Sequence, residues 1–247
     1  MSQAANGHRP GRVVVIRHHA EDSPGFVAEA FTALGARVTT HLFPGDGPLP
    51  GLDGAGHVVV LGAIPSVYDD GEPSAWIAAE VEWLREADAA GVPVLGICFG
   101  AQALCAALGG RVIPAPRKEI GWRMIEPADP EAIPPGPWLQ FHGDQCLPPR
   151  QAVILARNEV CVQAYSIGPH LGVQFHPEVD GQQLALWIAS GGREEAVRAG
   201  QDPDELVAQA YAQEPAARER AGRLVATALR IAGRRQVTPR LAGEPAR

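Results

Sequence analysis

The strongest constraint on the fold is one reactive residue between two glycines, at a point where the sequence pattern changes. Cys98 is the centre of the pentapeptide Gly-Ile-Cys-Phe-Gly at 96–100. The apolar run 92–95 before it is typical of a buried strand, and the run 101–108 after it is typical of a helix. Glycines two residues to either side let the chain turn sharply and present the side chain at the helix N-terminus. The sequence therefore predicts a nucleophile elbow.

The first half of the chain alternates between strand and helix patterns. Helical segments alternating with buried strands are typical of a parallel sheet covered on both faces, with sites at the carboxyl ends of its strands. We therefore expect a three-layer, flavodoxin-like α/β fold with a mostly parallel central sheet. Before the elbow, the expected strands are 12–17, 38–43 and 57–61, and the expected helices are 24–34 and 76–89.

The second half has a different pattern. Short strand-like runs separated by proline-rich connections predict an antiparallel extension of the same domain, and the composition from 182 onward predicts a helical C-terminal appendage. We expect a loose N-terminus at 1–11, a catalytic domain at 12–190, the appendage at 191–233 and a mobile tail at 234–247. The short runs are 111–113, 122–125, 152–155 and 160–165, and the clearest late helices are 205–211 and 216–231.

Composition excludes several functions. The 247 residues carry a net charge of -7, which argues against a nucleic-acid surface, and the single lysine, Lys118, cannot complete a Gly-rich ATP-binding loop. No apolar stretch approaches the ~18 residues of a membrane span, and the first residues lack the apolar region of a secretory signal. We expect a cytoplasmic protein that binds neither membrane nor nucleic acid, with its four cysteines reduced.

A cysteine nucleophile needs a base and a group that orients the base, and the segment 172–178 supplies both. His176 and Glu178 are two residues apart, so in an extended backbone their side chains point the same way. The predicted catalytic triad is Cys98, His176 and Glu178.

The heptapeptides Gly-Ile-Cys-Phe-Gly-Ala-Gln at 96–102 and Gly-Val-Gln-Phe-His-Pro-Glu at 172–178 resemble the signatures of class I (triad-type) glutamine amidotransferases. The resemblance covers roughly 13–187 and is greatest to stand-alone, GMP-synthase-like members. It implies hydrolysis of the γ-amide of glutamine through a cysteinyl γ-glutamyl thioester. The ammonia would pass to an acceptor in a synthetase domain or subunit, and no cofactor is implied.

The resemblance also implies an oxyanion hole made by the backbone N–H groups of Ala63 and Phe99. The loop Gly62-Ala63-Ile64 corresponds to a Gly-Gly-Pro loop in the family, so Ala63 replaces a glycine. Alanine resists positive φ, which makes a peptide flip harder. Two interpretations follow, a permanently formed hole or an impaired one, and we favour the first because the triad is intact.

Four substrate contacts are implied in the same way. Gly62 belongs to the oxyanion loop, Gln102 matches the family's Gly-x-Gln, and His142 and Asp144 lie in a segment that resembles its Trp-His-Gly-Asp. A helix-surface role for Gln102 and a structural role for the other pair remain open. The neighbouring His18 and His19 make a poor chelating pair because they point to opposite faces of a strand, so we expect no metal.

Two other functions remain open on sequence alone. A γ-glutamyl hydrolase or peptidase would use the same triad on a substituted γ-glutamyl amide. A catalytically silent regulatory or binding subunit would explain Ala63, which is its only support.

Overall fold

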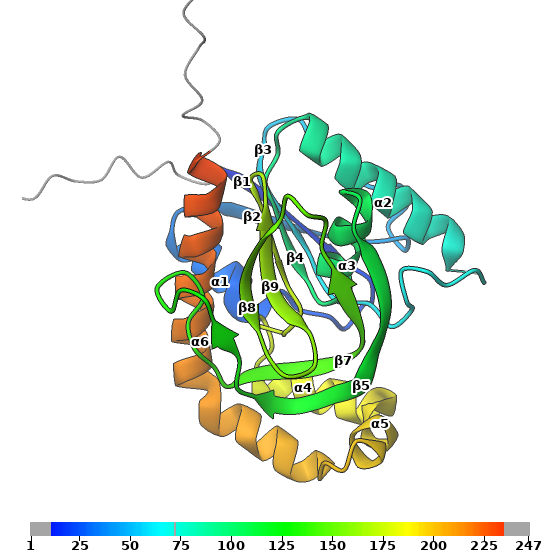
Figure 1. Cartoon of the computed structure of the whole chain (residues 1–247), viewed down its shortest axis with the longest axis vertical. Coiled ribbons are helices and arrows are strands. Elements are labelled where there is room, and N and C mark those ends of the chain that lie inside the picture. The colour runs from blue at the N-terminus through cyan, green and yellow to red at the C-terminus, as the bar shows by residue number, and fades with distance from the viewer. Residues whose placement is uncertain (1–10, 72, 235–247) are drawn as a thin grey trace, which may run out of the picture.

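The computed structural model describes residues 11–71 and 73–234, so most of the expected loose N-terminus and mobile tail lies outside the described residues. An eight-stranded sheet runs through its centre in the order β2-β1-β3-β4-β10-β9-β8-β6 (Figure 1). The first five strands are mutually parallel and the last three add antiparallel pairs. The predicted mostly parallel sheet with an antiparallel extension is confirmed. In sheet order the strands are Arg37–Leu42, Arg12–Arg17, Ala55–Val60, Val94–Ile97, His170–Val173, Val162–Ile167, Val153–Arg157 and Glu126–Pro127.

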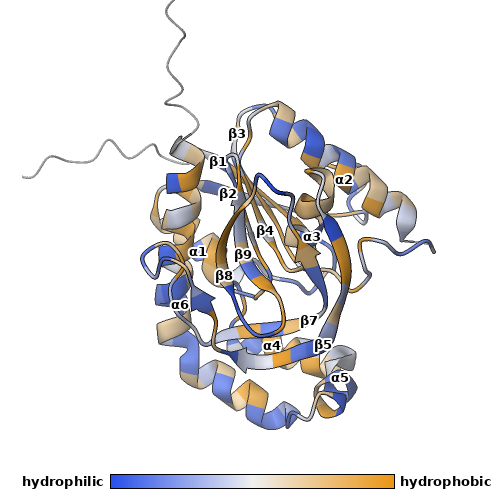
Figure 2. Ribbon diagram, in the orientation of Figure 1, coloured by the Kyte–Doolittle hydropathy of each residue, from blue (hydrophilic) through white to orange (hydrophobic). Residues whose placement is uncertain are grey.

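Alternation along β1 places apolar side chains on both faces of the sheet. Val13 and Val15 belong to one core cluster, and Val14 and Ile16 to another. The first cluster includes residues of α1 (Gly25–Ala33) and α6 (Pro203–Arg234), and the second includes residues of α2 (Ser74–Ala89) and α3 (Phe99–Ala107). Apolar strands between two helical layers are visible in Figure 2. Burial on both faces explains the uninterrupted β-branched runs of the sequence.

Beside the central sheet lies a two-stranded antiparallel arm that the sequence patterns did not predict. It pairs β5 (Arg111–Arg123) with β7 (Trp138–Leu147). The predicted run 111–113 is the start of the single strand β5 and the run 122–125 overlaps its end, so treating them as separate strands was wrong. The middle of β5 is polar and proline-rich, and its register with β7 shifts between Pro114 and Glu119. Because this part of the strand lacks large apolar residues, the hydrophobic pattern of the sequence does not indicate a continuous strand.

The C-terminal region also differs from its prediction. The segments 205–211 and 216–231 are one 32-residue helix, α6, with Pro215 inside it. A proline removes one helix hydrogen bond, but buried packing of Leu224 and Val225 in the core cluster with α1 holds the helix together across it. Between β10 and α6 lie α4 (Gly181–Trp187), an irregular turn η1 (Ile188–Gly192) and α5 (Arg193–Arg198). The domain boundary at 190 stays a prediction.

None of the helices within residues 11–71 and 73–234 is both long enough and apolar enough to cross a membrane.

Candidate active site

Cys98 occupies a strained turn between β4 and α3. It is the helix N-cap residue, with φ 52° and ψ -108°, and is the one described non-glycine residue with positive φ. Such a conformation costs on the order of 1–3 kcal/mol and persists only when the surroundings enforce it. A Cβ on Gly96 would lie 2.5 Å from the Gly100 oxygen, and one on Gly100 would lie 2.1 Å from the Val60 oxygen. Both glycines are therefore required by close backbone approach, as an elbow demands.

His176 and Glu178 follow strand β10, which lies beside β4 in the sheet. The Cys98 amide donates to the Val173 oxygen at 2.8 Å, which joins the elbow to the end of β10. His176 Nδ1 donates to Glu178 Oε1 at 2.8 Å, and both side chains are buried. The Phe26 amide at the start of α1 donates to the Glu178 backbone oxygen. Glu178 is therefore held through its carboxylate by His176 and through its backbone by the start of α1.

The electrostatics of His176 depend on both of its neighbours. Burial by itself would lower the pKa of His176, but the charges of Glu178 and Cys98, together with the hydrogen bond to Glu178, raise the pKa to about 10. The raised pKa keeps the imidazole in its protonated form near neutral pH. A thiolate beside an imidazolium is the reactive form of a cysteine nucleophile.

The predicted oxyanion loop, Gly62-Ala63-Ile64, lies against the side chains of Cys98 and His176. A Cβ on Gly62 would lie 3.1 Å from His176 Cε1 and 3.8 Å from Cys98 Cβ. Gly62 is therefore the residue of this loop that packs against the predicted nucleophile and base. Ala63 is not among the described residues with positive φ. Its methyl group is therefore compatible with the backbone at that position.

The other predicted contact residues lie in two hydrogen-bonded networks. Gln102 is buried on α3 and its Nε2 donates to Gln174 Oε1 at 3.3 Å. Asp144 accepts hydrogen bonds from Ser66 Oγ at 2.5 Å and Tyr68 Oη at 2.6 Å, so it connects β7 to the segment that follows the predicted oxyanion loop. Their contacts with substrate stay predictions.

Three neighbouring residues were not predicted as parts of the site. The Trp187 ring lies 4.9 Å from the His176 ring and its Nε1 donates to Asp22, so it covers the imidazole. His18 hydrogen-bonds to the Gly62 backbone oxygen of the predicted oxyanion loop and to Glu80. The sequence contained one relevant signal, the position of His18 directly after a strand; nothing local marks the other two.

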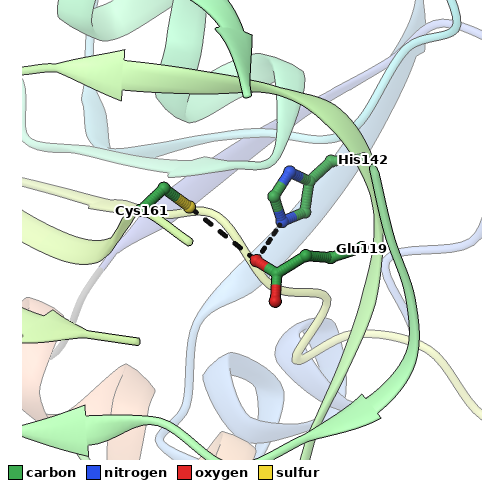
Figure 3. Close-up of side chains that lie close together, drawn as sticks. All are labelled: Glu119, His142 and Cys161. Carbon is green, nitrogen blue, oxygen red and sulfur yellow. Dashed lines mark hydrogen bonds and ion pairs between the residues drawn. The ribbon is translucent and has the colours of Figure 1, made fainter. Parts of the chain in front are cut away.

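His142 is part of a different cluster, drawn in Figure 3 with Glu119 and Cys161. Glu119 Oε2 lies 3.3 Å from His142 Nε2 and 3.9 Å from the Cys161 sulfur. Imidazole, carboxylate and thiol are all zinc ligands. However, His142 Nδ1 donates to the Asp144 backbone oxygen, and Glu119 Oε2 accepts a hydrogen bond from Gln163 Nε2 at 3.1 Å. Hydrogen bonds to protein groups therefore account for the positions of the imidazole and the carboxylate without a metal.

Hydrogen bonds and charge hold that cluster in place. Gln163 Nε2 donates to Glu119 Oε2 and to the Cys161 sulfur, and Asn158 Nδ2 donates to Glu119 Oε1 at 2.7 Å. Burial would raise the pKa of Glu119, but its contact with His142 leaves the pKa lowered. Burial and then the Glu119 charge raise the pKa of Cys161 to about 12. Cys161 is therefore a neutral thiol near pH 7.

Comparison with known proteins identifies the family of this chain. The sequence profile of the family described as "Glutamine amidotransferase class-I" matches residues 27–185. The chain belongs to this family. A Thermotoga maritima structure described as a glutamine amidotransferase superposes with a TM-score of 0.80 at 26% identity, over 90% of this chain and 99% of that one. A Methylobacillus flagellatus glutamine amidotransferase gives 0.78 at 25% identity, over 89% of this chain and 94% of that one.

Curated relatives of this amidotransferase are named as glutamine-hydrolyzing GMP synthases. The protein from Thermomicrobium roseum is 39% identical over 130 residues, which is 49% of this chain and 23% of that protein. The protein from Ignicoccus hospitalis, named as one subunit of such a synthase, is 42% identical over 96 residues, 35% of this chain and 51% of that protein. The match thus spans about a quarter of the first relative and about half of the second.

Proposed function

We propose that this amidotransferase hydrolyses the γ-amide of glutamine, with Cys98 as nucleophile, His176 as proton carrier and Glu178 as the group that orients it. The observation that carries the proposal is the single imidazole that interacts with both Cys98 and Glu178 at the carboxyl ends of two adjacent parallel strands. Membership of the family supports glutamine as the source of the amide.

In the first step the Cys98 thiolate attacks the γ-carbonyl carbon of glutamine. The negative charge moves to the carbonyl oxygen, where the amides of Ala63 and Phe99 would stabilise it. His176 then gives its proton to the departing nitrogen. The C–N bond breaks, ammonia leaves, and a γ-glutamyl thioester remains on the cysteine.

In the second step the now neutral His176 removes a proton from water. The hydroxide attacks the thioester carbon, the C–S bond breaks, and glutamate leaves while Cys98 returns to the thiolate. Glu178 stabilises the imidazolium in both steps and fixes its Nδ1–H. The overall reaction converts glutamine and water to glutamate and ammonia.

We propose that the ammonia is used by a synthetase. The support is the name of the Ignicoccus hospitalis relative, which pairs glutamine hydrolysis with a synthetic reaction in a GMP synthase of more than one chain. The acceptor for this chain would be a separate synthetase domain or subunit.

The direct test measures glutamate and ammonia release from glutamine by the purified protein and by Cys98→Ala, with Cys161→Ser as the matched control. We expect release by the wild type and the control but not by Cys98→Ala. Release from γ-glutamyl methylamide with glutamine inert would instead identify a γ-glutamyl hydrolase. Full activity in Cys98→Ala would contradict the assigned nucleophile.

A further inference from the structure

A buried charged pair lies directly behind the predicted oxyanion loop. His18, just after β1, has its Nε2 2.8 Å from Glu80 Oε2 of α2 and its Nδ1 2.9 Å from the Gly62 backbone oxygen. The side chains of His18 and Glu80 are 5% and 0% exposed. Buried charges are costly unless they are paired, so this pair needs a structural or functional reason.

The two contacts fix the protonation of His18. A backbone carbonyl and a carboxylate are both hydrogen-bond acceptors, so each ring nitrogen must carry a proton. Burial would lower the pKa of His18, but Glu80 and the Gly62 carbonyl outweigh it and the pKa is raised. The ring also lies against Trp76 and Phe99, with centroids 5.3 and 5.1 Å away, which restricts its rotation.

Holding the Gly62 oxygen also determines where the next amide points. The Gly62–Ala63 bond is not among the cis peptides of the described chain, so its C=O and N–H point in opposite directions. With the oxygen held by His18, the Ala63 N–H must point away from His18. Within the described residues neither this amide nor that of Phe99 donates a hydrogen bond to the protein.

We propose that His18, held by Glu80, is a positioning residue that keeps the Gly62–Ala63 peptide in the orientation of a formed oxyanion hole. The Ala63 and Phe99 amides are then both available to a substrate oxygen before substrate binds. This inference rests on the proposed function. It also explains the alanine in the loop, because a peptide that never has to flip does not need a second glycine.

The test compares two variants of His18 that lack a side-chain hydrogen-bond donor with a third variant that retains a donor. His18→Phe and His18→Leu retain apolar contact with Trp76 and Phe99 but cannot hold the Gly62 oxygen, whereas the amide of His18→Gln can. The matched control is His19→Phe, because His19 is exposed and follows in sequence. Melting temperatures verify that each variant is folded.

We expect kcat for glutamine hydrolysis to fall on the order of 10²-fold in the two donor-less variants, as for loss of one oxyanion donor. KM should change by less than about threefold, and His18→Gln should recover at least about tenfold of kcat. Alkylation of Cys98 by iodoacetamide should proceed at the wild-type rate, because displacement of iodide forms no oxyanion. Wild-type kcat in folded His18→Phe and His18→Leu would overturn the proposal.

A crystallographic measurement separates this inference from the proposed function. If the wild type hydrolyses no γ-glutamyl amide, the proposed function fails, but the peptide orientation can still be determined. We expect the Gly62 oxygen to face residue 18 in wild type and His18→Gln, and to rotate away in His18→Phe. An unchanged orientation in His18→Phe would show that His18 does not hold the peptide.

Discussion

Two buried clusters in this molecule contain the same three residue types, and they differ in the order in which those residues touch. In the first, His176 lies between Cys98 and Glu178. In the second, Glu119 lies between His142 and Cys161 (Figure 3). The two cysteines have the same exposed fraction, 6%. Access to solvent therefore does not distinguish them, and the position of the carboxylate does.

The group next to each sulfur determines whether the thiol or the thiolate is favoured. An imidazolium next to a thiol favours the thiolate, whereas a carboxylate next to a thiol disfavours it. Burial and Glu119 accordingly raise the pKa of Cys161 to about 12, while Cys98 itself contributes to the raised pKa of His176. The first arrangement is suited to nucleophilic catalysis, and the second joins the β5–β7 arm to Cys161, the residue just before strand β9.

The largest expected effect comes from removing each imidazole. His176→Asn should lower kcat for glutamine hydrolysis by at least about 10⁴-fold, because loss of a triad base disables the whole unit. His142→Asn should lower it by less than about tenfold, since His142 contacts Glu119 and the Asp144 backbone. Ammonia release under saturating glutamine measures both. Equal losses would mean that His142 also takes part in the chemistry.

Removing the charge of Glu178 should have the next largest effect on activity. In Glu178→Gln the side-chain amide can donate to His176 Nδ1, which favours the wrong tautomer and no longer stabilises the imidazolium. We expect a loss of roughly 10³-fold in kcat with little change in KM. A loss below about tenfold would remove Glu178 from the triad.

The corresponding change in the second cluster should affect stability. Glu119→Gln removes a buried carboxylate that lies 3.3 Å from His142 Nε2 and accepts hydrogen bonds from Asn158 and Gln163, which we expect to cost about 3 kcal/mol of unfolding free energy. Urea denaturation at pH 7 measures this cost, and kcat of the folded variant should stay within about tenfold of wild type. A variant as stable as wild type would show that the ion pair contributes nothing to folding.

The pH dependence of stability provides a smaller and more specific signal. The pKa of His176 is about 10 in the folded chain and ~6.5 in the unfolded chain, so its contribution is fully present below about pH 6.5. It is lost as pH rises towards 10, by up to about 1.4 kcal/mol per pH unit. Urea denaturation of wild type and His176→Asn between pH 6 and 10 should show their difference shrinking. A constant difference would contradict the raised pKa.

The sequence predicted the first cluster but not the second, because the residues of the first lie in two short motifs and those of the second are far apart along the chain. The elbow at Cys98 and the pair at His176 and Glu178 are local patterns, each completed within seven residues, so both could be located and expected to meet at adjacent strand ends. Glu119 and His142 meet only because β5 pairs with β7. The sequence of β5 does not alternate between apolar and polar residues, so this pairing could not be predicted from it. The sequence therefore did not predict that Glu119, His142 and Cys161 form a cluster.

The residues behind the predicted oxyanion loop could not be predicted from the sequence either, for the same reason. Ala63 could be recognised as a departure, but His18 and Glu80 are 62 positions apart, and only the packing of α2 against the sheet brings them together. The long helix α6 was divided at Pro215 because local propensity was the only available signal. Tertiary contacts with α1 override that propensity in the folded chain.

The most direct test of the contrast between the clusters is limited alkylation by iodoacetamide at pH 7, followed by peptide mapping and a parallel assay of glutamine hydrolysis. We predict that label accumulates on Cys98, that Cys161 stays unlabelled while the protein is folded, and that activity falls in proportion to the label on Cys98. Labelling of Cys161 at the rate of Cys98, or full activity after complete labelling of Cys98, would contradict it.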